Sequence, residues 1–429
     1  MPFLGFNHQS WNALLLLTLA VPFLFFPIAG YIALRWSPAK LRLPIFAIVN
    51  LFFALAVCLS RGTYGVRLHY IKQYIVFSSL MFLVYIVIVA IQYFLLDKKL
   101  GSWLPLFFPI LVLILVKYLP GSWTSVLLPA EFSKKVFADF FLGLSYMAFR
   151  LTYMVHEIRN EIVPMPGFSE YLSFAFFVPT LSIGPINPYS AFHNSLTKPD
   201  RSLTPIGRSW ARILIGLTKY VFLGNLANQL TYDGLLADGL PHHWIDFSIA
   251  VAGYCAYLYL NFSGFCDLAI GVSGLLGIHV HENFDRPFSK RNLQEFWAHW
   301  HMTLTNYMRD MVFVPLSKSL VRRFGPASAP HCIAAAIAIV FVLMGIWHGA
   351  GPTFVIYGLW HAVGVVAVHY YTLFLKKRLG KVRYAKYREN RVIYHIANAV
   401  TLVYFALGLI LVANSMHGLK LIFNAFRPM

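Results

Sequence analysis

The stretch AIAIVFVLMGIWHGAGPTFVIYGLWHA, residues 336–362, predicts an apolar helix that ends at Trp347 and His348, followed by a second apolar helix. Two glycines and a proline come within four residues of the histidine, and glycine and proline in succession end a helix. An ionisable side chain is expensive to keep at membrane depth, and imidazole is suited to take a proton from a hydroxyl. His348 is therefore a candidate general base, although a histidine hydrogen-bonded between helices would have the same spacing.

The composition of the whole chain is that of a multispanning membrane protein. Of its 429 residues 59% are hydrophobic and only 12% are charged, which excludes a water-soluble surface. We expect an all-α fold with roughly 10 to 12 membrane helices, because a series of apolar runs comes near the length needed to cross about 30 Å of hydrocarbon. The runs lie at residues 12–34, 43–59, 74–96, 103–119, 137–155, 171–186, 212–230, 244–262, 331–347, 353–375 and 393–413.

The sequence also gives expectations about domain organisation and about the cysteines. No repeat is visible, so we expect a single polytopic domain over residues 1–429. The run at 171–186 contains glycine and prolines, so it is expected to be broken or re-entrant. The four cysteines have neither a metal-ligand nor a disulfide spacing, so we expect no metal site.

The excess of basic residues indicates the topology. The formal net charge is +19, which we assign to basic cytoplasmic loops rather than to a nucleic-acid partner. Basic clusters at 286–291, 318–323 and 376–391 are predicted to be cytoplasmic loops, and His348 then lies toward the outer side. Basic residues also follow the run at 12–34, which puts the N-terminus outside a multi-pass protein of the cell membrane.

A second informative stretch is residues 281–325, which is expected to dip into the membrane and return. Asn292 is predicted to be the N-cap of a helix, with Glu295 three residues on. One face of that single helix is predicted to carry four residues at i, i+3, i+4 and i+7, namely Trp297, Trp300, His301 and Leu304. His301 then lies among aromatic side chains, whereas His299 and His361 are interpreted as structural.

Several blocks of the sequence resemble a known family. FWAHWHMTLTNYMRD (296–310) and GIWHGAGPTFVIYGLWHA (345–362) resemble the two signature blocks of bacterial membrane-bound O-acyltransferases. NFSGFCDLAIG (261–271), ENFDRPF (282–288), SYMAFR (145–150) and FVPTLSIGPI (177–186) also fit. The resemblance covers most of residues 100–375, and the C-terminal helix matches only in hydropathy. The sequence departs from the usual pattern at Ala298, His299 and Tyr307.

The resemblance implies a ring of membrane helices around a thin central tunnel, with re-entrant helices. An acyl thioester, either acetyl-CoA or an acyl carrier protein, would reach it from the cytoplasm as co-substrate, with no bound cofactor. The acceptor hydroxyl would come from outside. His348 takes the main catalytic role, and His301 supports it by orienting the thioester carbonyl or stabilising its oxyanion. We assign substrate binding to Trp297, Trp300, Trp347, Asn306, Asp310 and Asp267.

Two branches of the family and one other class remain open. FSGFCDLAIG, HENF and WHGAGPTFV are closer to the branch that acetylates exopolysaccharides, whereas FRLTYMVHEIRNE (149–161) and the short chain are closer to the teichoic acid D-alanylation branch. We favour acetyl transfer to an extracytoplasmic polysaccharide. The expected partners are the lipid bilayer, the donor or its acidic carrier protein, the acceptor polymer and extracytoplasmic proteins that complete delivery. A transporter or channel would usually show paired charges or repeat symmetry.

Overall fold

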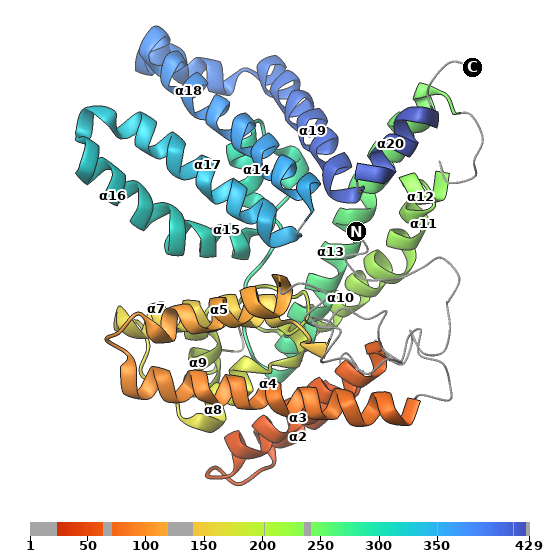
Figure 1. The fold of residues 1–429 in the computed structure, drawn as a ribbon, viewed down its shortest axis with the longest axis vertical. Coiled ribbons are helices and arrows are strands. Elements are labelled where there is room, and N and C mark those ends of the chain that lie inside the picture. The colour runs from red at the N-terminus through yellow and green to blue at the C-terminus, as the bar shows by residue number, and fades with distance from the viewer. Residues whose placement is uncertain are drawn as a thin grey trace. The chain divides into compact units, whose positions relative to one another are not determined.

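The computed structural model of the chain describes residues 24–62, 71–118, 140–200, 202–235, 242–349, 351–414 and 416–425. These residues are almost entirely helical (Figure 1), and the described ranges contain no β-strand beyond an isolated bridge between Phe284 and Trp300. The predicted all-α fold is therefore confirmed.

The described residues divide into two compact units. Of the described residues, those within 217–264 and 282–425 form the C-terminal unit, and those within 24–216 and 265–281 form the N-terminal unit. Helix α13 (Trp244–Leu276) contributes to both. The single domain over residues 1–429 stays a prediction.

Within the described part of the chain, six helices are long and apolar enough to cross a membrane. They are α3 (Arg42–Gly62), α4 (Ile71–Lys99), α13, α17 (Ala329–His348), α18 (Pro352–Glu389) and α19 (Arg391–Ala413). Each coincides with a predicted apolar run. The run at 103–119 forms the shorter α5 (Leu104–Tyr118). The predicted span at 12–34 lies mostly outside the described residues, so the total of 10 to 12 spans stays a prediction.

The N-terminal unit contains the broken helix predicted at 171–186. Besides α3 to α5 this unit holds α2 (Phe26–Arg35), α7 (Leu144–Arg159), α8 (Phe168–Ala175), η5 (Val178–Thr180), α9 (Tyr189–Thr197) and α10 (Ile206–Leu217). The predicted break is confirmed, because α8 ends at Ala175 and only a 3-10 turn follows. The guanidinium of the fully buried Arg150 donates to the carbonyl of Ala175 at 2.6 Å and to the hydroxyl of Thr180 at 2.7 Å. The buried guanidinium therefore supplies hydrogen-bond donors to a backbone carbonyl and a hydroxyl at the point where the helix is broken.

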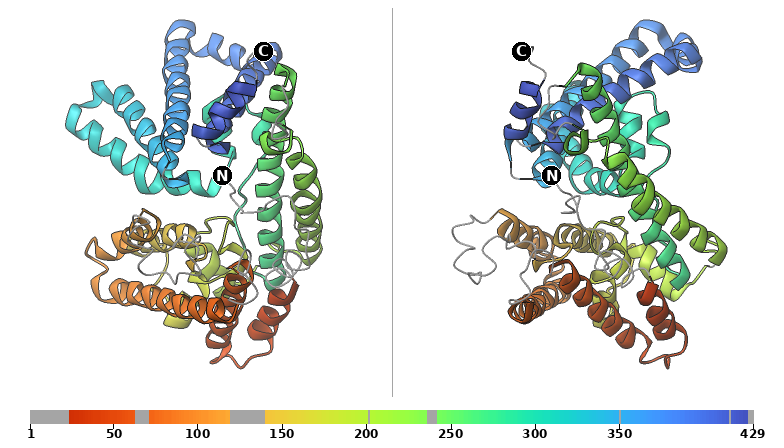
Figure 2. Two further views of the ribbon diagram at one scale, coloured as in Figure 1. Left: turned by 45° about the vertical axis from the view of Figure 1, so that its right-hand side comes forward. Right: turned by 90° about the vertical axis from the view of Figure 1, so that its right-hand side faces the viewer.

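The C-terminal unit carries both candidate catalytic histidines. Its helices after α13 are α14 (Leu293–His299), α15 (Met302–Met308), the π-helical turn η8 (Arg309–Phe313), α16 (Val314–Phe324), α17, α18, α19 and α20 (Met416–Ala425). Helix α17 packs against α16 and α18, and α18 packs against α19. Figure 2 shows these cyan and blue helices from two further directions. A Cβ on Gly358 would lie 2.6 Å from the Phe341 carbonyl oxygen, so α17 and α18 can approach this closely only because the residue is glycine.

Two of the three basic clusters lie on helices, so their prediction as loops is wrong, whereas residues 286–291 form a short 3-10 turn with non-helical backbone on either side. Residues 318–323 belong to α16, and residues 376–388 belong to the C-terminal half of α18. Helix α18 continues because lysine, arginine and leucine are good helix formers. The helix is kinked at Gly380, whose φ of 66° suits glycine. The side of the membrane on which these clusters lie stays a prediction.

Candidate active site

His348 is the last residue of α17, as the sequence predicts. Gly349 follows with extended backbone, and Pro352 begins α18. The His348 ring lies 4.8 Å from the ring of Trp347 and 5.8 Å from that of Tyr357, the latter nearly perpendicular. The glycines and the proline after the histidine end the helix at this point. The half-buried imidazole therefore lies at a helix end, beside two aromatic rings.

His301 lies at a break between two helices, so the predicted single helix face is wrong. Helix α14 ends at His299, Trp300 has extended backbone, and His301 has φ 49° and ψ 50°. Helix α15 then begins at Met302. A left-handed conformation is uncommon for a residue other than glycine, and such strain often occurs at functional sites.

The segment before α14 explains this break. The backbone N–H of Asp285 donates to the carbonyl of His299 at 3.1 Å, and that of Met302 donates to the carbonyl of Asn283 at 2.9 Å. These bonds connect residues on either side of Trp300 to an extended segment and replace bonds that a continuous helix would make. The prediction failed because pairing with residues 283–285 overrides the helical periodicity.

Asn283 fixes the tautomer of His301. The Asn283 Oδ1 lies 3.0 Å from the His301 Nδ1, and it accepts from the backbone N–H and the hydroxyl of Thr303 at 3.2 and 2.9 Å. Because the Thr303 N–H can only donate, the shared atom is the amide oxygen, and His301 Nδ1 must carry a proton to bond it. The other nitrogen, Nε2, is then an acceptor in the neutral ring.

Burial keeps His301 neutral. Its side chain is only 4% exposed, and desolvation, followed by the nearby His348, lowers the pKa of the His301 imidazole to about 3. A ring in this state is a weak base. It can accept a hydrogen bond at Nε2, whereas donation to an oxyanion from that atom would require a further proton.

The two histidines belong to one aromatic cluster, in which Trp347 lies beside both. The ring of Trp347 is 4.8 Å from that of His348 and 6.5 Å from that of His301. Phe262 of α13 contacts His301 edge-on at 4.7 Å. The structure therefore brings together two histidines that are far apart in the sequence.

The other residues assigned to substrate binding lie in different surroundings. Trp297 and Trp300 are buried, and Trp300 stacks on Phe296 with ring centroids 5.6 Å apart. Asn306 is exposed, and Asp310 pairs with Arg309 at 2.9 Å. Asp267 belongs to the N-terminal unit, where it forms an ion pair with Arg212. The three tryptophans are thus among the aromatic residues of the C-terminal unit, which also holds the two histidines. The binding roles of all six residues stay predictions.

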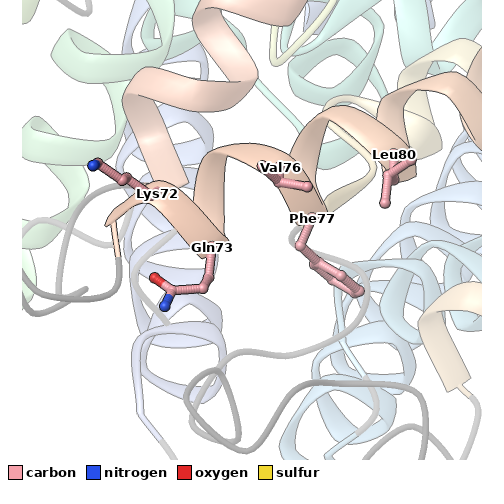
Figure 3. A pocket seen from close by; sticks show the side chains of 5 residues that line it. All are labelled: Lys72, Gln73, Val76, Phe77 and Leu80. Atoms are coloured by element: carbon pink, nitrogen blue, oxygen red, sulfur yellow. The ribbon is translucent and has the colours of Figure 1, made fainter.

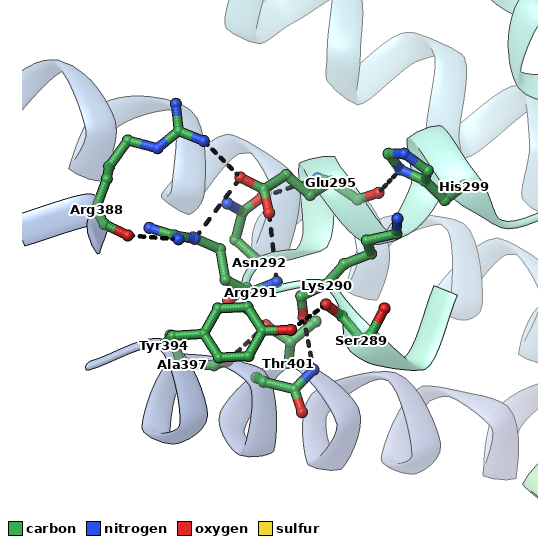
Figure 4. Close-up of polar contacts among 11 residues, drawn as sticks. Ser289, Lys290, Arg291, Asn292, Glu295, His299, Arg388, Tyr394, Ala397 and Thr401 are labelled. Atoms are coloured by element: carbon green, nitrogen blue, oxygen red, sulfur yellow. Dashed lines mark hydrogen bonds and ion pairs between the residues drawn. The ribbon is translucent and has the colours of Figure 1, made fainter. Parts of the chain in front are cut away.

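Helix α19 supports the site, which sequence reasoning missed. The side-chain amide of Asn398 donates to the carbonyls of Phe288 and Lys290 at 2.8 and 2.7 Å. The hydroxyl of Thr401 donates to the carbonyl of Arg291 at 3.0 Å, and Figure 4 shows this contact from α19. Asn398 and Thr401 are i and i+3 on a mostly apolar helix, and this polar pair was the signal that could have found them.

The start of α14 is held by charged and polar contacts (Figure 4). The predicted N-cap is confirmed, because Asn292 Oδ1 accepts from the backbone N–H of Glu295 at 2.8 Å. The Glu295 carboxylate pairs with Arg388 of α18 at 3.5 Å and with Arg291 at 3.9 Å. A residue of α18 and residues just before α14 therefore contact the first turn of α14, the helix that precedes His301.

A shallow hollow of about 420 Å³ lies along α4 in the N-terminal unit (Figure 3). Lys72, Gln73, Val76, Phe77 and Leu80 line it, and none of these is a carboxylate or a histidine. Among the described residues no group of three or more histidines, cysteines and acidic residues could hold a metal ion.

Comparison with known proteins gives the family. The sequence profile of the membrane-bound O-acyltransferase (MBOAT) family matches residues 44–411. The chain belongs to this family. The MBOAT protein is therefore a multi-pass membrane protein of an O-acyltransferase family, and the resemblance of the signature blocks is confirmed.

The relatives of this MBOAT enzyme include both branches of the family. Teichoic acid D-alanyltransferase of Streptococcus thermophilus is 32% identical over 59% of this chain, and that of Bacillus subtilis is 27% identical over 77%. The chain spans 60% of the first relative and 82% of the second. A probable alginate O-acetylase of Azotobacter vinelandii is 25% identical over 49% of this chain and 41% of its own length.

Proposed function

We propose that this enzyme transfers a small acyl group from a cytoplasmic thioester donor to a hydroxyl of an extracytoplasmic cell-envelope polymer. The observation that carries the proposal is the single aromatic cluster that holds His348 at a helix end beside Trp347 and the constrained His301. The relatives with teichoic acid and alginate in their names support an envelope polymer as the acceptor. The basic residues of α16 and α18 support a cytoplasmic approach of an anionic donor.

His348 acts as the base in this proposal. Its imidazole takes the proton of the acceptor hydroxyl, and the oxygen attacks the thioester carbonyl. The tetrahedral intermediate then expels the thiolate, which receives the proton from the His348 imidazolium. The ester is formed, the thiol is released, and His348 returns to its neutral form, so no other reactant is needed.

His301 takes an accepting role. Because its Nδ1 donates to Asn283 and its pKa is lowered to about 3, it is a poorer base than an ordinary histidine. Its Nε2 is suited to accept a hydrogen bond from a donor group of the substrate. This replaces the expectation that His301 donates to an oxyanion, since this tautomer has no Nε2 proton to offer.

We propose D-alanyl as the first candidate for the acyl group and acetyl as the second. The match with the Bacillus subtilis D-alanyltransferase covers 77% of this chain, against 49% for the alginate O-acetylase. A D-alanyl group also carries an ammonium, which could donate to the accepting His301, and an acetyl group has no such donor. The signature blocks nevertheless favour acetyl, so acetyl transfer remains the alternative.

Mass spectrometry of envelope polymers from strains with and without the gene tests the function and the acyl group together. We expect an ester-linked D-alanyl group that disappears with the gene and returns with a plasmid copy. An ester-linked acetyl group that behaves in this way would support the second candidate. Unchanged levels of both esters would contradict the proposed function.

The salt dependence of acyl transfer distinguishes a carrier-protein donor from a small thioester donor. A carrier protein is typically acidic, and attraction between opposite charges weakens as ionic strength rises. If the donor is bound to a carrier, transfer in membrane vesicles should fall steeply between low and high salt. Transfer from acetyl-CoA that does not change with salt would contradict a carrier-bound donor.

A further inference from the structure

His361 of α18 is fully buried, and its surroundings are unusual for an imidazole. Its side chain is 0% exposed, and neither ring nitrogen has a hydrogen-bond partner in the part of the chain that the structure describes. Buried polar atoms are normally paired, because an unpaired one costs its full desolvation free energy. Leucine would fill a similar volume without this cost, so packing alone does not account for a histidine at this position.

His361 contacts a ring that lies against His348 and a tryptophan of the helix before His301. Its ring lies 4.6 Å from the ring of Tyr357 and 5.0 Å from that of Trp297, and both contacts are nearly perpendicular. Tyr357 in turn contacts His348 edge-on at 5.8 Å. Trp297 lies on α14, four residues before His301. One side chain therefore contacts an aromatic neighbour of His348 and a tryptophan of the helix that precedes His301.

Close helix packing fixes the place of His361. A Cβ on Gly408 of α19 would lie only 2.8 Å from the His361 Nε2, so the imidazole fits beside α19 because residue 408 has no side chain. Phe341 of α17 and Phe405 of α19 lie on its other sides, with ring centroids at 6.4 and 6.0 Å. His361 thus lies where α14, α17, α18 and α19 meet.

We propose that His361 is a positioning residue of the acyl-transfer site, which holds Tyr357 against His348 and Trp297 against the turn that carries His301. The polar edge of the imidazole carries more positive charge than a hydrocarbon edge. It is therefore attracted to the negative face of a perpendicular aromatic ring. An aliphatic side chain would fill the space but would leave both aromatic residues less firmly oriented. This role revises the structural interpretation of His361 from its sequence.

The test compares His361→Leu and His361→Gln with His369→Leu. His369 lies two turns further along α18, and its Nε2–H donates to the Pro330 carbonyl at 3.2 Å, so it is a matched histidine outside the cluster. Because a small misplacement of reacting groups can cost about 100-fold in rate, we expect His361→Leu to lower kcat by about 10- to 100-fold. KM for the donor should stay within about twofold, because the residue does not touch the donor. His361→Gln, which keeps polar atoms, should recover part of kcat.

Thermal unfolding in detergent shows whether His361→Leu loses activity because the site is misplaced or because the helices pack less well. We expect Tm of His361→Leu to be equal to or higher than that of the wild type, because an unpaired buried imidazole is removed. His369→Leu should lower Tm slightly and keep kcat. A normal kcat in His361→Leu, or a loss of activity no greater than the loss of folded protein, would overturn the proposal. If His361→Leu does not accumulate, a normal kcat in His361→Gln would overturn it.

The inference rests on the proposed acyl transfer, and the same assay distinguishes the two. Wild-type membranes are supplied with acetyl-CoA or with a D-alanyl carrier-protein thioester and with envelope polymer. If the wild type transfers neither group, the proposed function fails. If it transfers one and His361→Leu transfers it equally fast, only the role of His361 fails.

Discussion

The amide oxygen of Asn283 accepts a hydrogen bond from the His301 Nδ1 at 3.0 Å and thereby leaves Nε2 as the ring nitrogen that can accept a hydrogen bond. The same oxygen accepts two bonds from Thr303, which holds it in place. His301 itself has a left-handed backbone that places it between α14 and α15. The orientation of this histidine is therefore determined by a residue 18 positions earlier in the chain.

Asn283→Ala tests this relationship. Loss of the acceptor frees the His301 ring to rotate or to change its tautomer, and loss of such an orienting contact typically costs about 10- to 100-fold at metal-bound histidines. We expect a loss of kcat in this range, measured as acyl transfer in membrane vesicles. Asn187→Ala is a suitable control, because Asn187 bonds His281 in the N-terminal unit. Equal activity of Asn283→Ala and wild type would show that the tautomer is not needed.

The stability of the enzyme should fall in mild acid because of His301. The pKa of its imidazole is about 3 in the native state, against about 6.5 in an unfolded chain. Between these values the unfolded chain binds a proton that the native protein does not. Lowering the pH from 6.5 toward 3 therefore favours unfolding, by up to about 1.4 kcal/mol per pH unit for this group.

Denaturation midpoints of the wild type and His301→Gln between pH 7 and pH 4 measure this effect. Glutamine does not titrate, so the variant should lose less stability as the pH falls. All other titrating groups are shared, so the difference between the two curves reports His301. Parallel curves would contradict the depressed pKa.

Asn398 should stabilise the C-terminal unit through the segment before α14. Asn398→Leu leaves the carbonyls of Phe288 and Lys290 without these donors, so we expect a loss of about 1–3 kcal/mol in the free energy of unfolding. Asn414→Ala is the control, since Asn414 directly follows α19 and, among the bonds that the structure describes, bonds only to the carbonyl of Ile410 in the last turn of that helix. Equal effects of the two substitutions on Tm would contradict a special role for Asn398.

Much of the fold followed from the sequence, because apolar length and helix-stop signals are local. Helix α17 ends at His348 and Asn292 caps α14, as the local pattern predicts. The break at His301 could not be predicted in this way, because it depends on pairing with Asn283 and Asp285. The tautomer of His301 and the contribution of Asn398 depend on distant segments for the same reason.

The topology can be tested by cysteine labelling. The basic helical segments at 318–323 and 376–391 should face the cytoplasm, because basic residues are retained on that side. A maleimide that cannot cross the membrane should label single cysteines there only after the cells are opened. Labelling of residues 376–391 in intact cells would require a different placement of His348.

The activity of His348→Ala tests the central claim most directly. At matched levels of folded protein in the membrane, acyl incorporation into the envelope polymer should fall by at least about 10²- to 10⁴-fold, the usual cost of losing a general base. His301→Ala should also impair incorporation, and His301→Gln, which keeps an accepting atom, should recover part of it. His348→Gln should recover none. Near-normal incorporation by His348→Ala would contradict the assignment of His348 as the base.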